Sequence, residues 1–202
     1  MRREESRTRN RAALISTARE LFLRDGYQAT SIARIAAESG FTTGAVYSNF
    51  DGKAQLALVV LQEIQAERLA ELAAVIDSAD PVQGLADWTS AAMASGWPRL
   101  ELEFALDVRG DAALVRAEAD RRRALVDTLT EAVERRGLRG PIPVRTLVDA
   151  AVNLAIGLAT RRVIDPTVTA DSLIELTRAA VGLLSEEGGG AVQGTAPPPE
   201  GG

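Results

Sequence analysis

The side chains best suited to contact another molecule lie between Thr30 and Lys53. Two hydroxyl residues, Thr42 and Thr43, precede the small residues Gly44 and Ala45, and Tyr47 and Lys53 follow. Hydroxyl, phenol and ammonium groups can all bond phosphate oxygens, and threonine or alanine methyls can contact the methyl group of thymine. These residue types, in this order, favour contact with DNA over catalysis.

The segment that carries these side chains is predicted to form two short helices, over 31–38 and 42–48. Gly40 in the turn between them can adopt a left-handed backbone, and Phe41 is expected to bury its ring between the helices. We expect Val46 and Phe50 to point into the protein and Tyr47 and Asn49 to face outward. This arrangement places a helix in the major groove. An ordinary capped helical hairpin is the alternative.

Lys53 closes the segment and is the single lysine of a chain that has 23 lysine and arginine residues together. A compact ammonium at the start of the next helix is well suited to a phosphate. Residues 1–53 carry nine basic and six acidic side chains, whereas residues 54–202 carry fourteen basic and twenty-two acidic ones. The basic part can attract phosphate while the body stays acidic. A solvated polar terminus is the alternative for the first arginines.

Composition excludes several kinds of site. The 202 residues include no cysteine and no histidine, so thiolate zinc sites, cysteine nucleophiles and imidazole bases are absent. We expect no metal, no cofactor and no enzymatic activity. No apolar run approaches the ~20 residues that a membrane span needs. The sequence predicts a cytoplasmic protein without a membrane partner.

The apolar spacing predicts an all-α fold of about nine helices. An N-terminal three-helix head, residues 1–53, carries the helix-turn-helix, and a helical body for ligand binding and dimerisation covers 54–187. Residues 188–202 are rich in glycine and proline and are expected to be disordered. The helices are expected at about 7–25, 31–38, 42–48, 52–76, 80–95, 98–108, 111–136, 144–164 and 170–186.

The segment resembles the DNA-binding head of the TetR family of bacterial transcriptional regulators. The resemblance covers roughly residues 11–60, and its anchors fall in register. They are Thr30-Ser31, Ile35-Ala36, Gly40-Phe41 and the run from Tyr47 through Phe50 to Lys53. The rest of the chain matches the family only in its helical architecture.

This resemblance implies a homodimer in which each subunit offers one helix-turn-helix to half of a roughly palindromic operator in double-stranded DNA. Thr42, Thr43, Gly44 and Ala45 would then lie against base edges, and Thr30, Tyr47 and Lys53 would hold phosphates. The implied function is that of a ligand-responsive regulator. We expect a repressor that an unidentified small-molecule effector releases from DNA.

The last two predicted helices are the expected dimer interface. The helix over 144–164 is apolar on two faces, as expected when a helix packs on its own core and on a partner. A monomer core is the alternative. The expected interface residues are Leu147, Ala151, Leu154, Leu158, Leu173, Leu176, Ala180 and Leu183.

The effector pocket is expected in the middle helices, where large flexible or aromatic side chains gather. The candidate lining residues are Trp88, Met93, Trp97, Phe104 and Asn153. An ordinary core position is the alternative for each aromatic residue. Two other functions stay open: an enzyme on a helical bundle, and a helical dimer that binds a small molecule or a partner without DNA. Asp51, a negative charge close to the expected phosphates, favours the second.

Overall fold

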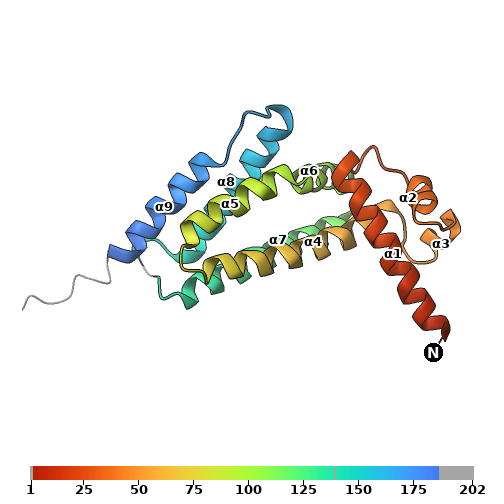
Figure 1. Cartoon of the computed structure of the whole chain (residues 1–202), viewed down its shortest axis with the longest axis horizontal. Helices are drawn as coiled ribbons and strands as arrows, with labels where there is room; N and C mark the ends of the chain where they lie inside the picture. The colour runs from red at the N-terminus through yellow and green to blue at the C-terminus, as the bar shows by residue number, and fades with distance from the viewer. Residues whose placement is uncertain (1, 139, 187–202) are drawn as a thin grey trace, which may run out of the picture.

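The computed structural model describes residues 2–138 and 140–186, and within them it contains nine α-helices and no strand (Figure 1). The all-α prediction is confirmed. The helices are α1 (Arg2–Asp25), α2 (Ile32–Glu38), α3 (Thr43–Tyr47), α4 (Lys53–Ile76), α5 (Pro81–Ala94), α6 (Trp97–Val108), α7 (Ala112–Arg135), α8 (Val144–Ile164) and α9 (Asp171–Glu186).

The molecule is elongated, with α1, α2 and α3 at one end and α9 at the other (Figure 1). The long helix α4 begins beside the three N-terminal helices and runs along α7 through the body. The helices α5, α6 and α8 pack over this pair. Because α4 spans both ends, it connects the surface of α2 and α3 mechanically to the body.

Most predicted helix boundaries lie within one or two residues of the observed ones. The exception is α1, which begins at Arg2 and not near residue 7. The first residues have no apolar period to reveal a helix, yet arginine and glutamate are good helix formers, so the helix extends through them. The predicted division at residue 53 stays a prediction, and the predicted tail, 188–202, lies outside the described residues.

One large hydrophobic cluster holds α1, α2, α3 and the first half of α4 together. Leu14 and Phe22 of α1 and Ile35 of α2 are buried there. This cluster also includes Phe104 of α6, whose ring meets the ring of Tyr27 edge to face at 6.0 Å. The core of the N-terminal part therefore continues into a helix of the body.

The body has a smaller apolar cluster and a buried ionic one. Its second hydrophobic cluster consists of Leu158, Val168 and Leu173. The guanidinium of Arg121 is almost fully buried and donates to Glu118 at 2.8 Å and to Glu101 at 2.6 Å. These bonds join α6 to α7 and satisfy charges that would be costly to bury alone. The body interior is therefore partly polar.

Candidate nucleic-acid interface

The turn between α2 and α3 is built as its sequence predicts. Gly40 has φ +75°, and the N–H of Phe41 donates to the carbonyl of Ala36 at 2.9 Å. A side chain at Gly40 would be strained in this left-handed conformation. Thr42 then caps α3, because its hydroxyl oxygen accepts from the N–H of Ala45 at 3.2 Å. The turn and the cap fix the angle at which α3 leaves α2.

The two sides of α3 differ in burial. Val46 and Phe50 are buried in the hydrophobic cluster, as predicted. Thr42, Thr43 and Gly44 are exposed on the other side, Ala45 is half-buried, and the side chain of Tyr47 is 62 % exposed. Five of the predicted DNA-contacting residues thus share one outward surface. Their contact with bases or phosphates stays a prediction.

Two side chains of this region turn inward, against expectation. Thr30 is 1 % exposed, and its hydroxyl donates to the carbonyl of Gly26 at 2.8 Å. Its side chain therefore closes the loop between α1 and α2 and is not available to a phosphate. Asn49 was expected to face outward, but its Nδ2 donates to the carbonyl of Ala45 at 2.8 Å and ties down the end of α3.

Lys53 is partly exposed and has a partner within the protein. Its Nζ lies 4.0 Å from the centroid of the Tyr27 ring and donates to the Tyr27 carbonyl at 3.1 Å. A cation above an aromatic ring is held electrostatically, and this bond uses one of three ammonium donors. Lys53 is therefore anchored at the start of α4, and its contact with a phosphate stays a prediction.

Tyr27 also connects the N-terminal helices to α6. Its hydroxyl donates to Oδ2 of Asp107 at 2.5 Å, and burial and this bond raise the pKa of the phenol. Nearby, the N–H of Gln28 donates to Glu103 at 2.8 Å, and Arg99 donates to Glu103 at 2.7 Å. Burial raises the pKa of Glu103, but these bonds outweigh it and hold the pKa below its usual value.

This junction is the part of the site that sequence analysis missed. Tyr27 and Asp107 are 80 residues apart, and no local pattern links two such positions. Gly26-Tyr27 follows the end of α1, and an aromatic residue in such a place is a candidate for burial. This local pattern does not identify the residue that the ring or its hydroxyl contacts.

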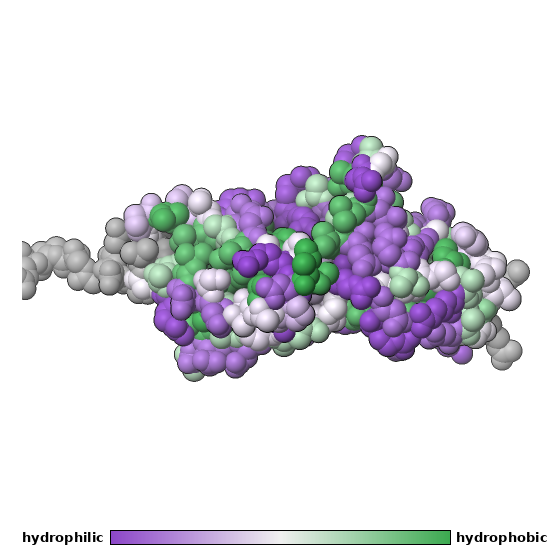
Figure 2. Space-filling view, turned by 90° about the horizontal axis from the view of Figure 1, so that it is seen from above, coloured by the Kyte–Doolittle hydropathy of each residue, from purple (hydrophilic) through white to green (hydrophobic). Residues whose placement is uncertain are grey.

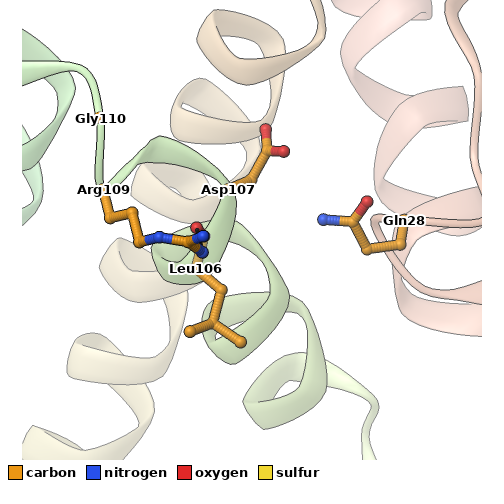
Figure 3. A pocket seen from close by; sticks show the side chains of 5 residues that line it. All are labelled: Gln28, Leu106, Asp107, Arg109 and Gly110. Atoms are coloured by element: carbon orange, nitrogen blue, oxygen red, sulfur yellow. Dashed lines mark hydrogen bonds between the residues drawn. The ribbon is translucent and has the colours of Figure 1, made fainter.

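A shallow hollow of about 380 Å³ lies at the same junction (Figure 3). Figure 3 shows Gln28 reaching from the loop after α1 toward Asp107 at the end of α6, with Arg109 on the other side. Leu106 and Gly110 complete the lining. The hollow includes none of the five residues, Trp88, Met93, Trp97, Phe104 and Asn153, that are predicted to line an effector pocket.

The predicted pocket residues do not share one place. Trp88 and Trp97 do meet, with ring centroids 6.5 Å apart. Met93, however, packs against the second hydrophobic cluster, and Phe104 is fully buried in the first. Asn153 is exposed on α8 and bonds Asp149 at 3.2 Å. The prediction of a single pocket from these five residues is corrected, because the helices turn three of them in different directions.

The predicted interface residues divide into two groups. Leu158 and Leu173 are 7 % and 5 % exposed and form the body's own core, so they do not offer a surface to a partner. Leu176 is 47 % exposed. Four others are half-buried, namely Leu147, Ala151, Leu154 and Ala180, and the side chain of Leu183 lies outside those described. Figure 2 shows apolar residues gathered at the end of the molecule away from α1, α2 and α3.

The described residues offer no group of three or more histidine, cysteine, aspartate or glutamate side chains that could hold a metal ion. Among the same residues, no helix combines the length and apolar character needed to cross a membrane. Arg7, Arg9 and Arg11 of α1 are exposed, and the guanidinium of Arg11 lies 4.9 Å from the Phe50 ring centroid. This contact brings the basic turns of α1 close to the end of α3.

Comparisons with known proteins agree with this geometry. The family profile described as "Bacterial regulatory proteins, tetR family" matches residues 14–60. No curated protein matches the chain. Two solved structures of similar fold are a putative transcriptional regulator from Rhodococcus sp. RHA1 and a TetR-family transcriptional regulator from Streptomyces coelicolor. The first is 20% identical with a TM-score of 0.71, covering 87% of this chain and 95% of that one.

The Streptomyces coelicolor structure is 24% identical with a TM-score of 0.69, and the match covers 90% of this chain and 95% of that one. A putative transcriptional regulator from Saccharomonospora viridis, solved in complex with choline, is 16% identical with a TM-score of 0.67. That match covers 85% of this chain and 95% of the other. At these identities the comparisons show a shared fold. Because each match covers at least 85% of this chain, that fold includes the body as well as the N-terminal helices.

Proposed function

We propose that the chain is a regulator of the tetR family, because residues 14–60 match that family's profile and solved TetR-family regulators share its fold. As such a regulator it represses transcription by binding an operator as a homodimer and leaves the operator when an effector binds. In this proposal residues 1–53 are the DNA-binding domain and residues 54–187 bind the effector and the second subunit. The protein acts in the cytoplasm, as a regulator and not as an enzyme.

The observation that carries the proposal is the outward surface of α3. Small and hydroxyl side chains at Thr42, Thr43 and Gly44 are exposed together, with Tyr47 beside them, while the opposite side is anchored by buried Val46 and Phe50. Short side chains allow the helix to approach the base edges closely, and hydroxyls can bond bases or phosphates. A hairpin whose only role is structural has no need of this uniform exposed surface.

Lys53 and Tyr47 are the proposed phosphate contacts. Lys53 stands at the N-terminus of α4, where the helix dipole also favours an anion. Its anchoring by Tyr27 limits the freedom of the ammonium before DNA arrives, which lowers the entropy lost on binding. Arg7, Arg9 and Arg11 are exposed on α1, and the guanidinium of Arg11 lies over the Phe50 ring beside the end of α3.

The proposed homodimer is supported by the apolar residues that gather on the surface of the body (Figure 2). Leu176 on α9 and Val163 and Ile164 at the end of α8 are large apolar residues left exposed in one chain. Exposed apolar surface of this kind marks association sites, and a two-fold axis there would pair two heads with two half-sites. Leu147, Ala151, Leu154 and Ala180, which are half-buried, would complete the interface.

The proposed response to an effector runs through α4 and α6. Solved structures of similar fold include one in complex with choline and another in complex with triclosan, which supports a small-molecule site in this body. The junction of Tyr27 with Asp107 ties the head to α6, and Lys53 begins α4. A shift of either helix would change how the two heads match the operator, and linkage makes the effect reciprocal.

One observation favours a second candidate, a helical dimer that binds a small molecule or partner without DNA. Lys53 already has a carbonyl and a ring as partners, and Asp51 is exposed beside it. In that case the lysine serves only to join Tyr27 to α4. The difference between the two candidates is whether any duplex binds at all.

Selection of bound duplexes from a random DNA pool tests the proposal. The purified full chain is expected to recover a palindrome whose half-sites are separated by about one helical turn or a multiple of it. Thr43→Ala should alter the recovered sequence, whereas Thr167→Ala, a hydroxyl change in the exposed α8–α9 loop, should not. Failure to recover any enriched sequence would reject the regulator and favour the second candidate.

A further inference from the structure

Two tryptophans meet between α5 and α6, and they are the only two in the chain. Trp88 and Trp97 pack edge to face, with 6.5 Å between their ring centroids and an interplanar angle of 78°. Both residues are half-buried. The pair therefore forms an aromatic wall that reaches from the protein interior to the solvent.

Polar donors converge beside this wall. Arg68 Nη1 and Trp88 Nε1 both donate to the same oxygen, Oε2 of Glu71, at 2.7 Å and 3.1 Å. The Glu71 side chain is 47 % exposed, so it can move aside. A guanidinium and an indole N–H aimed at one carboxylate oxygen would hold an oxygen of another anion in the same way.

Two further donors on these side chains have no acceptor within the described residues. Nε of Arg68 and Nε1 of Trp97 are buried and unpaired. Both groups can only donate, so only an acceptor atom can satisfy them. An unpaired buried donor is costly, and such groups are rare in folded proteins. A ligand that satisfies these donors must therefore combine acceptor oxygens with an apolar or aromatic part that packs on the indoles.

We propose that Arg68, Trp88 and Trp97 form the effector site and that the effector is an apolar anion, a carboxylate or sulfonate on an aromatic frame. This inference rests on the proposed function, because it names the chemical class of the regulator's effector. The effector's ring packs against the two indoles, and its anionic group takes the place of the Glu71 carboxylate at Arg68. Glu71 occupies the donors when no effector is bound.

The position of Trp97 connects this site to the head. Trp97 is the first residue of α6, directly after Gly96, and a Cβ on Gly96 would lie 2.2 Å from the carbonyl oxygen of Leu23 on α1. Two residues further, Arg99 donates to the carbonyl of Asp25 at 2.9 Å. Because α6 touches the end of α1 so closely, an effector that displaces Trp97 also displaces α6 against the head.

The test uses 1-anilinonaphthalene-8-sulfonate as the anionic probe and N-phenyl-1-naphthylamine as its match without the sulfonate. Energy transfer from the two tryptophans to the bound probe reports its proximity to the site. The wild-type chain is expected to bind the sulfonate at least about tenfold more tightly than the neutral probe, since the charged bonds to Arg68 are lost without it. Equal affinity for the two probes would overturn the proposal.

Variants at the two charged residues should change the sulfonate affinity in opposite directions. Arg68→Gln is expected to weaken binding at least about tenfold, and Glu71→Ala to strengthen it several-fold, because the internal competitor is gone. Glu63→Ala removes an exposed charge elsewhere on α4 and is the control for net charge. Glu71→Ala behaving like Glu63→Ala would overturn the proposal even where Arg68→Gln fails to fold.

Operator binding without probe is measured on the same preparations. If the wild-type chain does not bind the operator, the proposed regulator is rejected, but opposite changes in sulfonate affinity for Arg68→Gln and Glu71→Ala still identify the anion site. Conversely, intact operator binding with no discrimination between the probes rejects the effector site alone. The sulfonate is also expected to weaken operator binding by the wild-type chain, and an unchanged operator affinity at saturating probe would overturn its role as an effector site.

Discussion

The N-terminal part and the body of this protein bury their apolar residues to different degrees. In the N-terminal part, Tyr47 is the one large apolar or aromatic side chain among the described residues that is left exposed. In the body, six such residues are exposed, and they are Leu106, Val115, Ile142, Val163, Ile164 and Leu176. The N-terminal part, whose core is completed by Phe104 of α6, thus leaves little apolar surface uncovered, whereas the body leaves several large apolar side chains available to a partner.

The two parts also differ in what lies inside them. The N-terminal core is apolar and aromatic, with Phe22, Tyr27 and Phe104 in ring contact. The body interior holds the Arg121 ion cluster and buried donors without acceptors. A close-packed apolar core is rigid, while polar interiors can exchange partners. A rigid N-terminal part joined to a body that can rearrange is the arrangement that a ligand-responsive regulator requires.

The largest effect is expected from removing the Phe104 ring, which joins the two parts. Phe104→Ala should destabilise the protein by about 3–5 kcal/mol, because it opens a cavity in the core of the N-terminal part from a helix of the body. Urea unfolding followed by circular dichroism measures the loss. Leu106→Ala, at a 53 % exposed position on the same helix, is the control and should change little. Equal effects of the two changes would contradict the shared core.

A charge placed on the body's exposed apolar surface should break the dimer. Leu176→Asp is expected to raise the dimer dissociation constant at least about tenfold, because the partner would bury an unpaired carboxylate. Analytical ultracentrifugation over a range of concentrations measures this constant. Leu106→Asp, at a leucine of similar exposure near the head, is the matched control. A dimer that tolerates Leu176→Asp would place the interface elsewhere.

A smaller effect separates the two tyrosines. Tyr27→Phe removes the hydroxyl bonded to Asp107 and should cost about 1 kcal/mol, since the carboxylate is partly solvated. Tyr47→Phe should leave the free energy of unfolding unchanged and weaken operator binding. Thermal unfolding and a gel-shift titration on both variants give the comparison. If Tyr47→Phe lowers the stability and Tyr27→Phe does not, the buried role of Tyr27 and the exposed role of Tyr47 are wrongly assigned.

The smallest effect concerns the pKa of Glu103. Because its folded-state pKa is lowered, the stability that it contributes is present above its ordinary pKa of 4.5 and is lost as the pH falls through the lowered value. The wild-type melting temperature should therefore decrease more than that of Glu103→Gln between about pH 6 and about pH 3. Glu131→Gln on the exposed side of α7 is the control. If the melting temperatures of Glu103→Gln and the wild type fall in parallel with pH, Glu103 does not make the proposed stabilising bonds to Gln28 and Arg99.

The local parts of this structure could be predicted from sequence, and the long-range parts could not. The cap at Thr42, the turn at Gly40 and the buried residues Val46 and Phe50 depend on neighbours within a few positions, and the period of the helices reveals them. The inward turn of Thr30 was missed, because a hydroxyl before a helix has the same appearance whether it faces a phosphate or a carbonyl.

The body shows the same limit more strongly. An apolar helix face predicts burial but does not say which neighbour covers it, so Leu158 and Leu173 were assigned to a partner and lie in the chain's own core. The contact of Tyr27 with Asp107 and the burial of Arg121 depend on how helices far apart in sequence pack. A pattern of residue types does not contain that information.

The dependence of operator affinity on salt tests most directly whether the exposed surface beside α3 binds DNA. The logarithm of the binding constant should fall steeply with the logarithm of salt concentration. Lys53→Gln should make this slope shallower by about two for a dimer that loses one phosphate contact per subunit, while Lys53→Arg keeps it. Melting temperatures establish that both variants are folded. A slope that Lys53→Gln leaves unchanged, or affinity independent of salt, would contradict the proposed interface.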